Sequence, residues 1–199
     1  MIFVINSVSR KSAQQVYHEA KSGDIILCKQ KHLSYIYNNI ANFSHSAIII
    51  VHPDTNKKYV VEIFRNKDKD LNDIKIVSLR DKIREYSGDL FHLRLKKTVD
   101  TTIVQQFLDK LPLYVKKYTF NHDIEKYVMT CFAQRLYMRW FSHENNTKLV
   151  CTEFVGLIMK DLGVVSESFD NQCLLSGDFR FITDNGIKLY DDISYIYPR

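Results

Sequence analysis

A cysteine near the end of the chain stands where a helix is expected to begin. The stretch 150–163 has the rhythm of a half-buried helix, with apolar side chains on one face: Phe154, Val155, Ile158 and Leu162. Cys151 falls in its first turn, where unpaired backbone N–H groups and the positive end of the helix dipole favour a thiolate. Gly163 is placed to end the helix in the left-handed conformation. On the helix alone, a small buried hydrophobe is the commoner role for such a cysteine, so a nucleophile needs a base and an orienting group elsewhere.

Two neighbouring predicted strands supply a histidine and a glutamate. Residues 44–51 read as a strand with His45 at its entrance, and residues 58–64 read as the returning strand of a hairpin, with Glu62 near its end. Both side chains then lie at the same edge of the sheet, although sequence does not fix the register. Taken alone, His45 would be a strand-end histidine satisfied by the backbone, and Glu62 an exposed strand residue. Glu62 has apolar neighbours on both sides, however, so it needs a partner, and His45 is the natural one.

The remaining pattern predicts an α+β fold, a small, mostly antiparallel sheet or half-barrel packed against helices, with the cysteine helix late in the chain. The predicted helices are 7–22, with Ser9 or Ser12 as cap, 79–86, a helix from 101 that Pro112 ends or bends, and 122–140. The further predicted strands are 25–28, 74–78, 89–95, 178–182 and 187–196, and the segment 29–43 is expected to be a loop over the site.

Composition narrows the class of protein. A chain of 199 residues with a net charge of +5 suits one domain, and the charge permits weak attraction to nucleic acid or anionic lipid without demanding either. No stretch has the length of a secretory signal or a membrane span, so a soluble chain is expected. The cysteines form no CxxC and are expected to be reduced thiols in an intracellular setting: Cys28, Cys131, Cys151 and Cys173. The histidines show no metal-ligand spacing, so neither a metal nor a cofactor is predicted.

Four short motifs occur in an order that resembles one known group of proteins. They are Gly23-Asp-Ile-Ile26, Phe43-Ser-His45, Val60-Val-Glu62 and Cys151-Thr-Glu-Phe-Val155. This order is similar to the circularly permuted branch of the papain-like NlpC-type superfamily, which includes YiiX-like hydrolases, lecithin:retinol acyltransferase-like proteins and proteins of poxviruses and other large DNA viruses. The likeness is greatest to the viral and YiiX-like members. It covers most of a single domain, 1–199, since residues 117–121 resemble the segment that precedes the cysteine helix. The longer helical stretch around 122–146 departs from the pattern and is expected to be an insertion.

The resemblance implies a catalytic triad. Cys151 would be the nucleophile, His45 the general base and later acid, and Glu62 the group that orients the imidazole and stabilises its charged form. The reaction would pass through a thioester on the way to cleavage or transfer of an amide or ester bond in a peptide, acyl-peptide or lipid. The backbone N–H of Cys151 would be one oxyanion donor.

Two other functions remain open from the sequence. A catalytically silent viral relative of the fold could bind lipid or protein as a virulence or virion factor, with peripheral membrane contact. A nucleic-acid binder would use the basic face of the 122–140 helix, formed by Lys126, Arg135 and Arg139, although a solvated face is the commoner role of such charges. No nucleic acid is therefore expected as a partner, and the expected location is the cytoplasm, or the host cytoplasm or virion for a viral protein.

Overall fold

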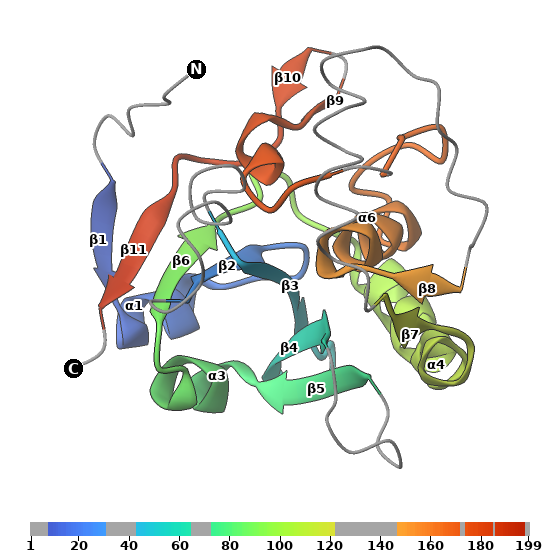
Figure 1. Ribbon diagram of the computed structural model, residues 1–199, viewed down its shortest axis with the longest axis horizontal. Coiled ribbons are helices and arrows are strands. Elements are labelled where there is room, and N and C mark those ends of the chain that lie inside the picture. Colours follow the sequence, from blue (N-terminus) through green and yellow to red (C-terminus); the bar gives the residue numbers. More distant parts are fainter. Residues whose placement is uncertain are drawn as a thin grey trace.

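The computed structural model describes residues 8–30, 43–64, 73–121, 147–171, 174–184 and 186–197. Within these ranges seven strands form one sheet in the order β1-β11-β6-β2-β3-β4-β5 (Figure 1), antiparallel except for the parallel pair β1–β11. Their bounds are β1 (Ser9–Ser12), β2 (Ile25–Lys29), β3 (His45–Val51), β4 (Lys58–Ile63), β5 (Ile74–Ser78), β6 (Asp89–Leu93) and β11 (Ser194–Tyr197). Two short pairs lie outside this sheet: β7 (Thr119–Phe120) with β8 (Lys148–Leu149), and β9 (Thr183–Asp184) with β10 (Ile187–Lys188). The predicted α+β class with a mostly antiparallel sheet is confirmed at this level.

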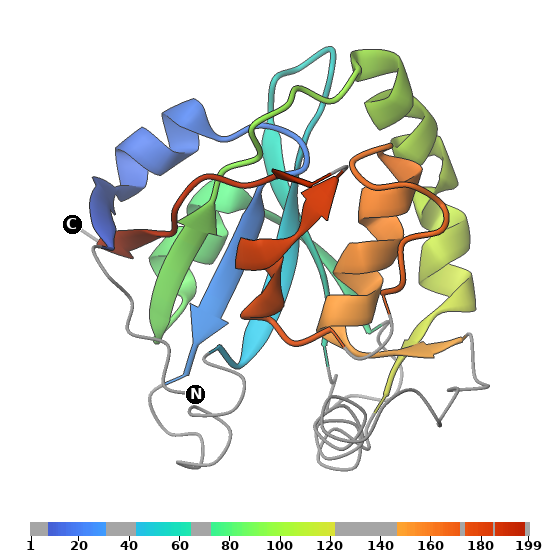
Figure 2. The ribbon, with the colours of Figure 1, turned by 90° about the horizontal axis from the view of Figure 1, so that it is seen from above.

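Helices cover both faces of the sheet. On one face lie α1 (Ala13–Glu19) and α3 (Leu79–Glu85), and on the other lie α4 (Thr101–Lys117) and α6 (Cys151–Asp161), as Figures 1 and 2 show. Strand residues alternate between the two cores: Ile25 and Leu27 pack on the α6 side, whereas Ile26 and Cys28 pack on the α3 side. This alternation follows from the two-residue period of an extended strand. The central strands are therefore buried on both faces, which explains their nearly continuous apolar runs.

Several sequence predictions of local structure were wrong at their boundaries. The predicted helix 7–22 begins instead as strand β1, because its backbone pairs with β11, and the helix starts only after Ser12. Ser12 is its cap: its hydroxyl accepts from the Gln15 N–H at 3.2 Å, and the Gln15 side chain accepts from the Ser12 N–H at 2.8 Å. Of the two roles predicted for Pro112, ending the helix is wrong: α4 runs through Pro112 to Lys117, and buried Phe107 and Leu111 anchor it before the missing hydrogen bond.

Near the C-terminus, the predicted strands also differ from the structure. Residues 178–181 form a 3₁₀ turn, η1 (Asp178–Phe181), in place of a strand, and its Phe179 is fully buried. The predicted strand 187–196 divides into β10 and β11, and the chain between them bonds back to the end of β6 through a bridge from Tyr190 to Leu95. The predicted insertion around 122–146, with Cys131, lies outside the described residues, as does Cys173. None of the described helices combines the length and apolar character that a bilayer crossing needs.

A buried hydrogen-bonded pair of side chains fixes the turn that precedes β2. Asp24 and His92 are fully buried, and the His92 Nε2 lies 2.8 Å from the Asp24 Oδ2. The Asp24 carboxylate also accepts the N–H of Leu95 at 2.8 Å and the N–H of Lys21 at 3.1 Å. Gly23 stands beside it at φ +91°, and a Cβ there would meet the Leu95 side chain at 2.7 Å. The Gly-Asp pair thus has a structural role, holding β2 against the end of β6.

Asp24→Ala is expected to lower the free energy of unfolding by about 3–5 kcal/mol, because it leaves an imidazole and two backbone N–H groups buried without their acceptor. Urea unfolding followed by circular dichroism measures the change. Asp192→Ala is the matched control, since Asp192 forms an exposed pair with Lys188. Equal stabilities of the two variants would show that the buried pair does not hold the turn.

Candidate active site

Cys151 is the first residue of α6, as the sequence predicted. The helix packs against β3 and β4, and its apolar stripe is fully buried. Glu153 reaches back so that its Oε2 accepts the N–H of Val150 at 3.1 Å, which satisfies one donor of the helix start. The following chain is tied to the same turn: the Thr152 hydroxyl donates to the Leu174 carbonyl at 2.6 Å, and the Asn171 amide donates to the Glu153 carbonyl at 3.0 Å. The cysteine therefore sits on a helix end that is held from two sides.

The strands β3 and β4 stop pairing before they reach the site. Their ladder ends at the pair Ile48–Val61, although β3 begins at His45 and β4 continues to Ile63. By strand alternation, His45 and Glu62 belong to the α3 side of the sheet, while Ser46 belongs to the α6 side with Cys151. Because no backbone hydrogen bonds join the strands at this end, the imidazole can contact groups on both sides of the sheet.

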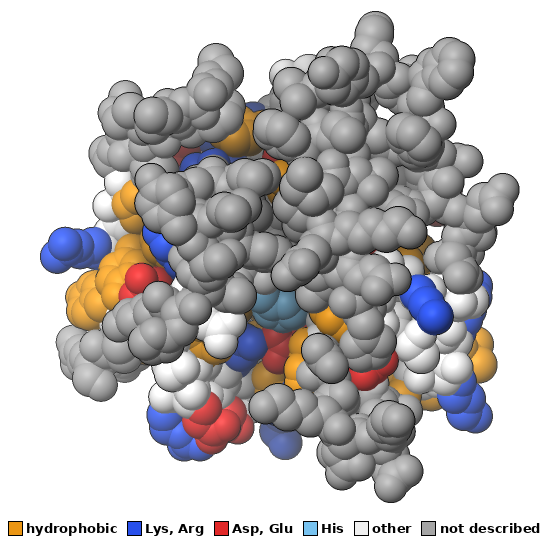
Figure 3. Space-filling view, in the orientation of Figure 1, with side chains coloured by type: hydrophobic (Ala, Val, Ile, Leu, Met, Phe, Trp, Pro, Cys, Tyr) orange, Lys and Arg blue, Asp and Glu red, His pale blue; other side chains and the backbone are white. Residues whose placement is uncertain are grey.

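The imidazole of His45 joins two elements that are distant in sequence. Its Nε2 lies 2.8 Å from the Glu62 Oε2, and the ring also lies close enough to the Cys151 thiol for that group to raise the pKa of His45. The side chain of His45 is 18% exposed and that of Glu62 is 7% exposed, so the pair is largely shielded while the ring still reaches solvent. Figure 3 shows histidine surface near the centre of the face seen in Figure 1, beside acidic and basic side chains.

The environment of Cys151 favours the thiolate. Burial by itself raises the pKa of the thiol, but the charge and hydrogen bond of His45, followed by the backbone N–H and the hydroxyl of Ser46, lower the pKa below its ordinary value. The Ser46 hydroxyl is buried, and it makes no hydrogen bond of good geometry with any described residue. Burial alone would also lower the pKa of His45, yet the Cys151 thiolate and then Glu62 raise it to about 9. Thiolate and imidazolium stabilise one another.

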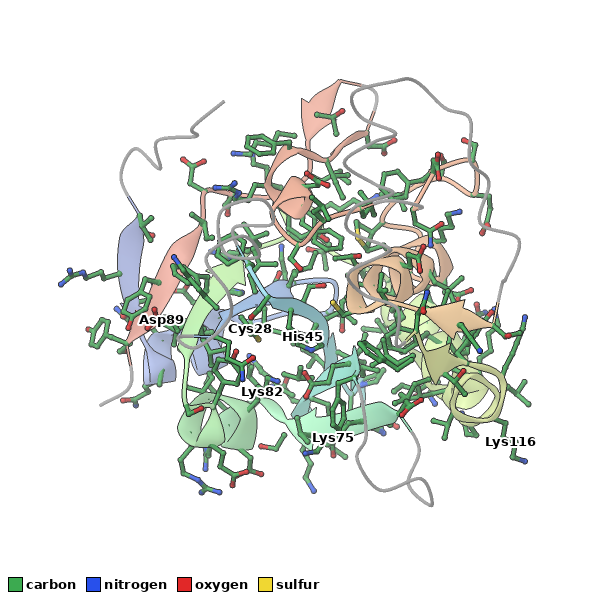
Figure 4. The ribbon with its side chains drawn as sticks, viewed as in Figure 1. Cys28, His45, Lys75, Lys82, Asp89 and Lys116 are labelled. Carbon is green, nitrogen blue, oxygen red and sulfur yellow. The ribbon has the colours of Figure 1, made fainter. Side chains whose placement is uncertain are left out.

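Glu62 is the anion of the cluster and has two cationic neighbours. Burial by itself raises the pKa of Glu62, but the hydrogen bonds and charges of His45 and Lys82 lower it to about 2. The Lys82 ammonium, from α3, lies 2.6 Å from the same Oε2 that His45 contacts. Figure 4 shows Lys82, His45 and Cys28 around one region between α3 and the central strands. By contrast, burial raises the pKa of Cys28 to about 12, so this neighbouring thiol stays protonated.

The structure brings together all three residues that the sequence singled out, Cys151, His45 and Glu62. It adds two that were missed. Lys82 had a signal: with Leu79, Ile83 and Tyr86 it lies on the inner stripe of α3 at spacings of three and four residues. Ser46 follows the histidine in sequence: strand alternation places its side chain on the α6 side, and the early end of the β3–β4 ladder leaves its backbone N–H to the thiol.

Chemically, the cluster combines a thiol with a lowered pKa, an imidazole with a raised pKa and a carboxylate with a lowered pKa. In the described part of the chain, no group of three or more His, Cys, Asp or Glu side chains is arranged to hold a metal ion. Cys28 and Cys151 are both free thiols.

Comparisons with known proteins give a distant structural likeness. No protein-family profile matches the sequence, and no curated protein matches it. Among solved structures, the chain is similar to the metalloprotein YiiX from Escherichia coli O157:H7, with 16% sequence identity and a TM-score of 0.43, over 72% of this chain and 67% of that one. YiiX-like proteins are one branch of the group that the sequence motifs resemble.

The pKa changes predict how stability depends on pH. The lowered pKa of Glu62 stabilises the fold above the ordinary value of 4.5, and this contribution is lost as pH falls toward about 2. The raised pKa of His45 stabilises the fold below 6.5, and this contribution is lost as pH rises through about 9. The stability lost on Glu62→Gln should therefore be largest between about pH 4.5 and 6.5 and should shrink on both sides.

Unfolding free energies of wild type and Glu62→Gln in urea, from pH 3 to 10, measure this difference. Cys151 titrates in both proteins, so the difference reports the carboxylate together with its effect on the charges of His45 and Cys151. A difference that stays constant over the whole range would mean that Glu62 and His45 do not form a charged pair.

Proposed function

We propose that the protein is a thiol-dependent hydrolase or acyltransferase, with Cys151 as the nucleophile, His45 as the acid–base group and Glu62 as the residue that orients the imidazole. The observation that carries the proposal is the single imidazole between a carboxylate at 2.8 Å and a thiol whose pKa is lowered at a helix start. A merely structural cysteine has no need of a neighbouring imidazolium. Cys28 is buried near the same cluster, and burial raises its pKa, whereas the pKa of Cys151 is lowered.

The first half of the reaction makes a thioester. The Cys151 thiolate attacks the acyl carbon, a carbon–sulfur bond forms, and the carbonyl electron pair moves to oxygen. The Cys151 backbone N–H at the start of α6 stabilises this oxyanion. As the tetrahedral intermediate collapses, the carbon–nitrogen or carbon–oxygen bond breaks and His45 gives its proton to the leaving group.

The second half releases the acyl group. Neutral His45 takes a proton from water or from an acceptor hydroxyl or amine, which attacks the thioester carbon, and the sulfur leaves as thiolate beside the restored imidazolium. Throughout, Glu62 stays ionised and balances the charge on the ring. Hydrolysis and transfer differ only in which nucleophile enters, and amide or ester bonds of peptides, acyl-peptides or lipids are the substrate class.

The alternative is a catalytically silent protein of the same fold, binding lipid or protein as a virulence or virion factor. It predicts no turnover and no preferential chemistry at Cys151. Reactivity of this thiol therefore separates the two proposals.

At neutral pH, Cys151 is expected to react with iodoacetamide and with acyl thiol probes faster than Cys28, which is buried with a pKa raised to about 12. Mass spectrometry of the intact protein and its peptides measures all four cysteines at once, with Cys28, Cys131 and Cys173 as internal comparators. Probes with short, long and peptidyl acyl groups report the substrate class.

Cys151→Ala should abolish probe labelling and lower turnover of a cleaved probe by more than about 10³-fold, with the circular dichroism spectrum unchanged. Labelling of Cys151 no faster than that of the comparators in wild type would overturn the assignment of the nucleophile.

A further inference from the structure

Lys82 is a buried cation that the three-residue mechanism leaves without a role. Its side chain is 12% exposed, and its ammonium lies 2.6 Å from the Glu62 Oε2. Helix α3 fixes this position: the Ser78 hydroxyl accepts the N–H of Asp81 at 3.3 Å at the helix start, and Leu79 and Ile83 pack into the core on either side of Lys82. The ammonium also stands 5.2 Å from the centre of the Tyr86 ring. The lysine is thus held in place from its own helix.

One carboxylate oxygen serves two cations. The Glu62 Oε2 contacts both the Lys82 ammonium at 2.6 Å and the His45 Nε2 at 2.8 Å. If the imidazole were its only partner, the buried carboxylate would stabilise the protonated form of His45 with its full negative charge. A single contact would also leave the carboxylate free to rotate. A second cation on the same oxygen restrains the carboxylate and offsets part of its charge.

We propose that Lys82 is a positioning residue of the site, which locks the Glu62 carboxylate against His45 and weakens its hold on the imidazole proton. The inference rests on the proposed function, because it concerns how easily His45 gives its proton to a leaving group. Without Lys82, the same ring would remain charged but would release its proton less readily.

The other charged or titratable groups near Glu62 come from each packed element. They are His45 of β3, Cys151 of α6, Cys28 of β2, Tyr86 after α3 and Lys75 of β5. Lys75 is the cross-strand partner of Glu62, but its side chain is exposed and its ammonium stands 5.6 Å from the centre of the Phe64 ring. Figure 4 shows Lys75 away from the region shared by Lys82 and His45. Lys75 therefore provides a matched control of equal charge on a neighbouring element.

The experiment titrates the His45 ring by NMR in protein labelled in histidine, and measures the rate of Cys151 alkylation against pH. Lys82→Met and Lys82→Gln both remove the charge, and each should raise the pKa of His45. Each should also move the acidic limb of the alkylation profile to higher pH, because the thiolate then forms beside a less compensated carboxylate. Every unit of that displacement slows alkylation at acidic pH about tenfold. Lys82→Arg should restore the wild-type profile, and Lys75→Met should leave it unchanged.

Three results would overturn the role of Lys82. The first two are an unchanged His45 titration in folded Lys82→Met or Lys82→Gln, and an equal displacement in Lys75→Met. Loss of probe labelling without any displacement of either titration would indicate a purely structural lysine and would also reject the proposal. A different result, an unreactive Cys151 in the wild-type protein, would overturn the proposed function. The His45 titration in the Lys82 variants does not depend on that reactivity, so the two failures can be distinguished.

Discussion

The site depends on the place where β3 and β4 cease to be hydrogen-bonded. Up to Ile48 and Val61 the two strands form a continuous ladder that separates the α3 side of the sheet from the α6 side. Beyond it, His45 lies between a carboxylate from one side and a thiol from the other. If pairing continued for two more residues, the sheet would separate the Glu62 carboxylate from the Cys151 thiol. The ladder must therefore end early for the charges to interact.

The energetic cost of this arrangement is spread over several partners. Burial opposes the charge on each of Cys151, His45 and Glu62, and in each case neighbouring charges and hydrogen bonds outweigh it. None of these groups would hold its ionic form alone, since an isolated buried charge neutralises instead. The cluster is cooperative for that reason. At its α3 end, the single Glu62 carboxylate contacts two cationic groups, the His45 ring and the Lys82 ammonium.

Sequence patterns predicted the parts of this fold that depend on local periodicity. The cysteine helix, its buried stripe and its left-handed end at Gly163 (φ +62°) follow from 3.6-residue spacing and glycine placement. The strands that carry His45 and Glu62 follow from apolar runs and a turn. What local pattern could not give is register: the end of the β3–β4 ladder, the orientation of Ser46 and the contact of Lys82 with Glu62 are tertiary facts. The same limit explains β1, whose strand form depends on a partner 185 residues away.

That long-range partnership has a consequence for connectivity. Strands β1 and β11 run side by side in parallel at the edge of the sheet, with Ser12 paired to Tyr197 (Figure 1). A tether from the exit of β11 back to the entry of β1 would have to span only a four-residue strand, on the order of 13 Å. With such a tether in place, a new opening in a surface turn such as 52–56 would leave every contact of the thiol, imidazole and carboxylate intact. The order of the strands and helices along the chain could thus be changed with little effect on the contacts among Cys151, His45 and Glu62.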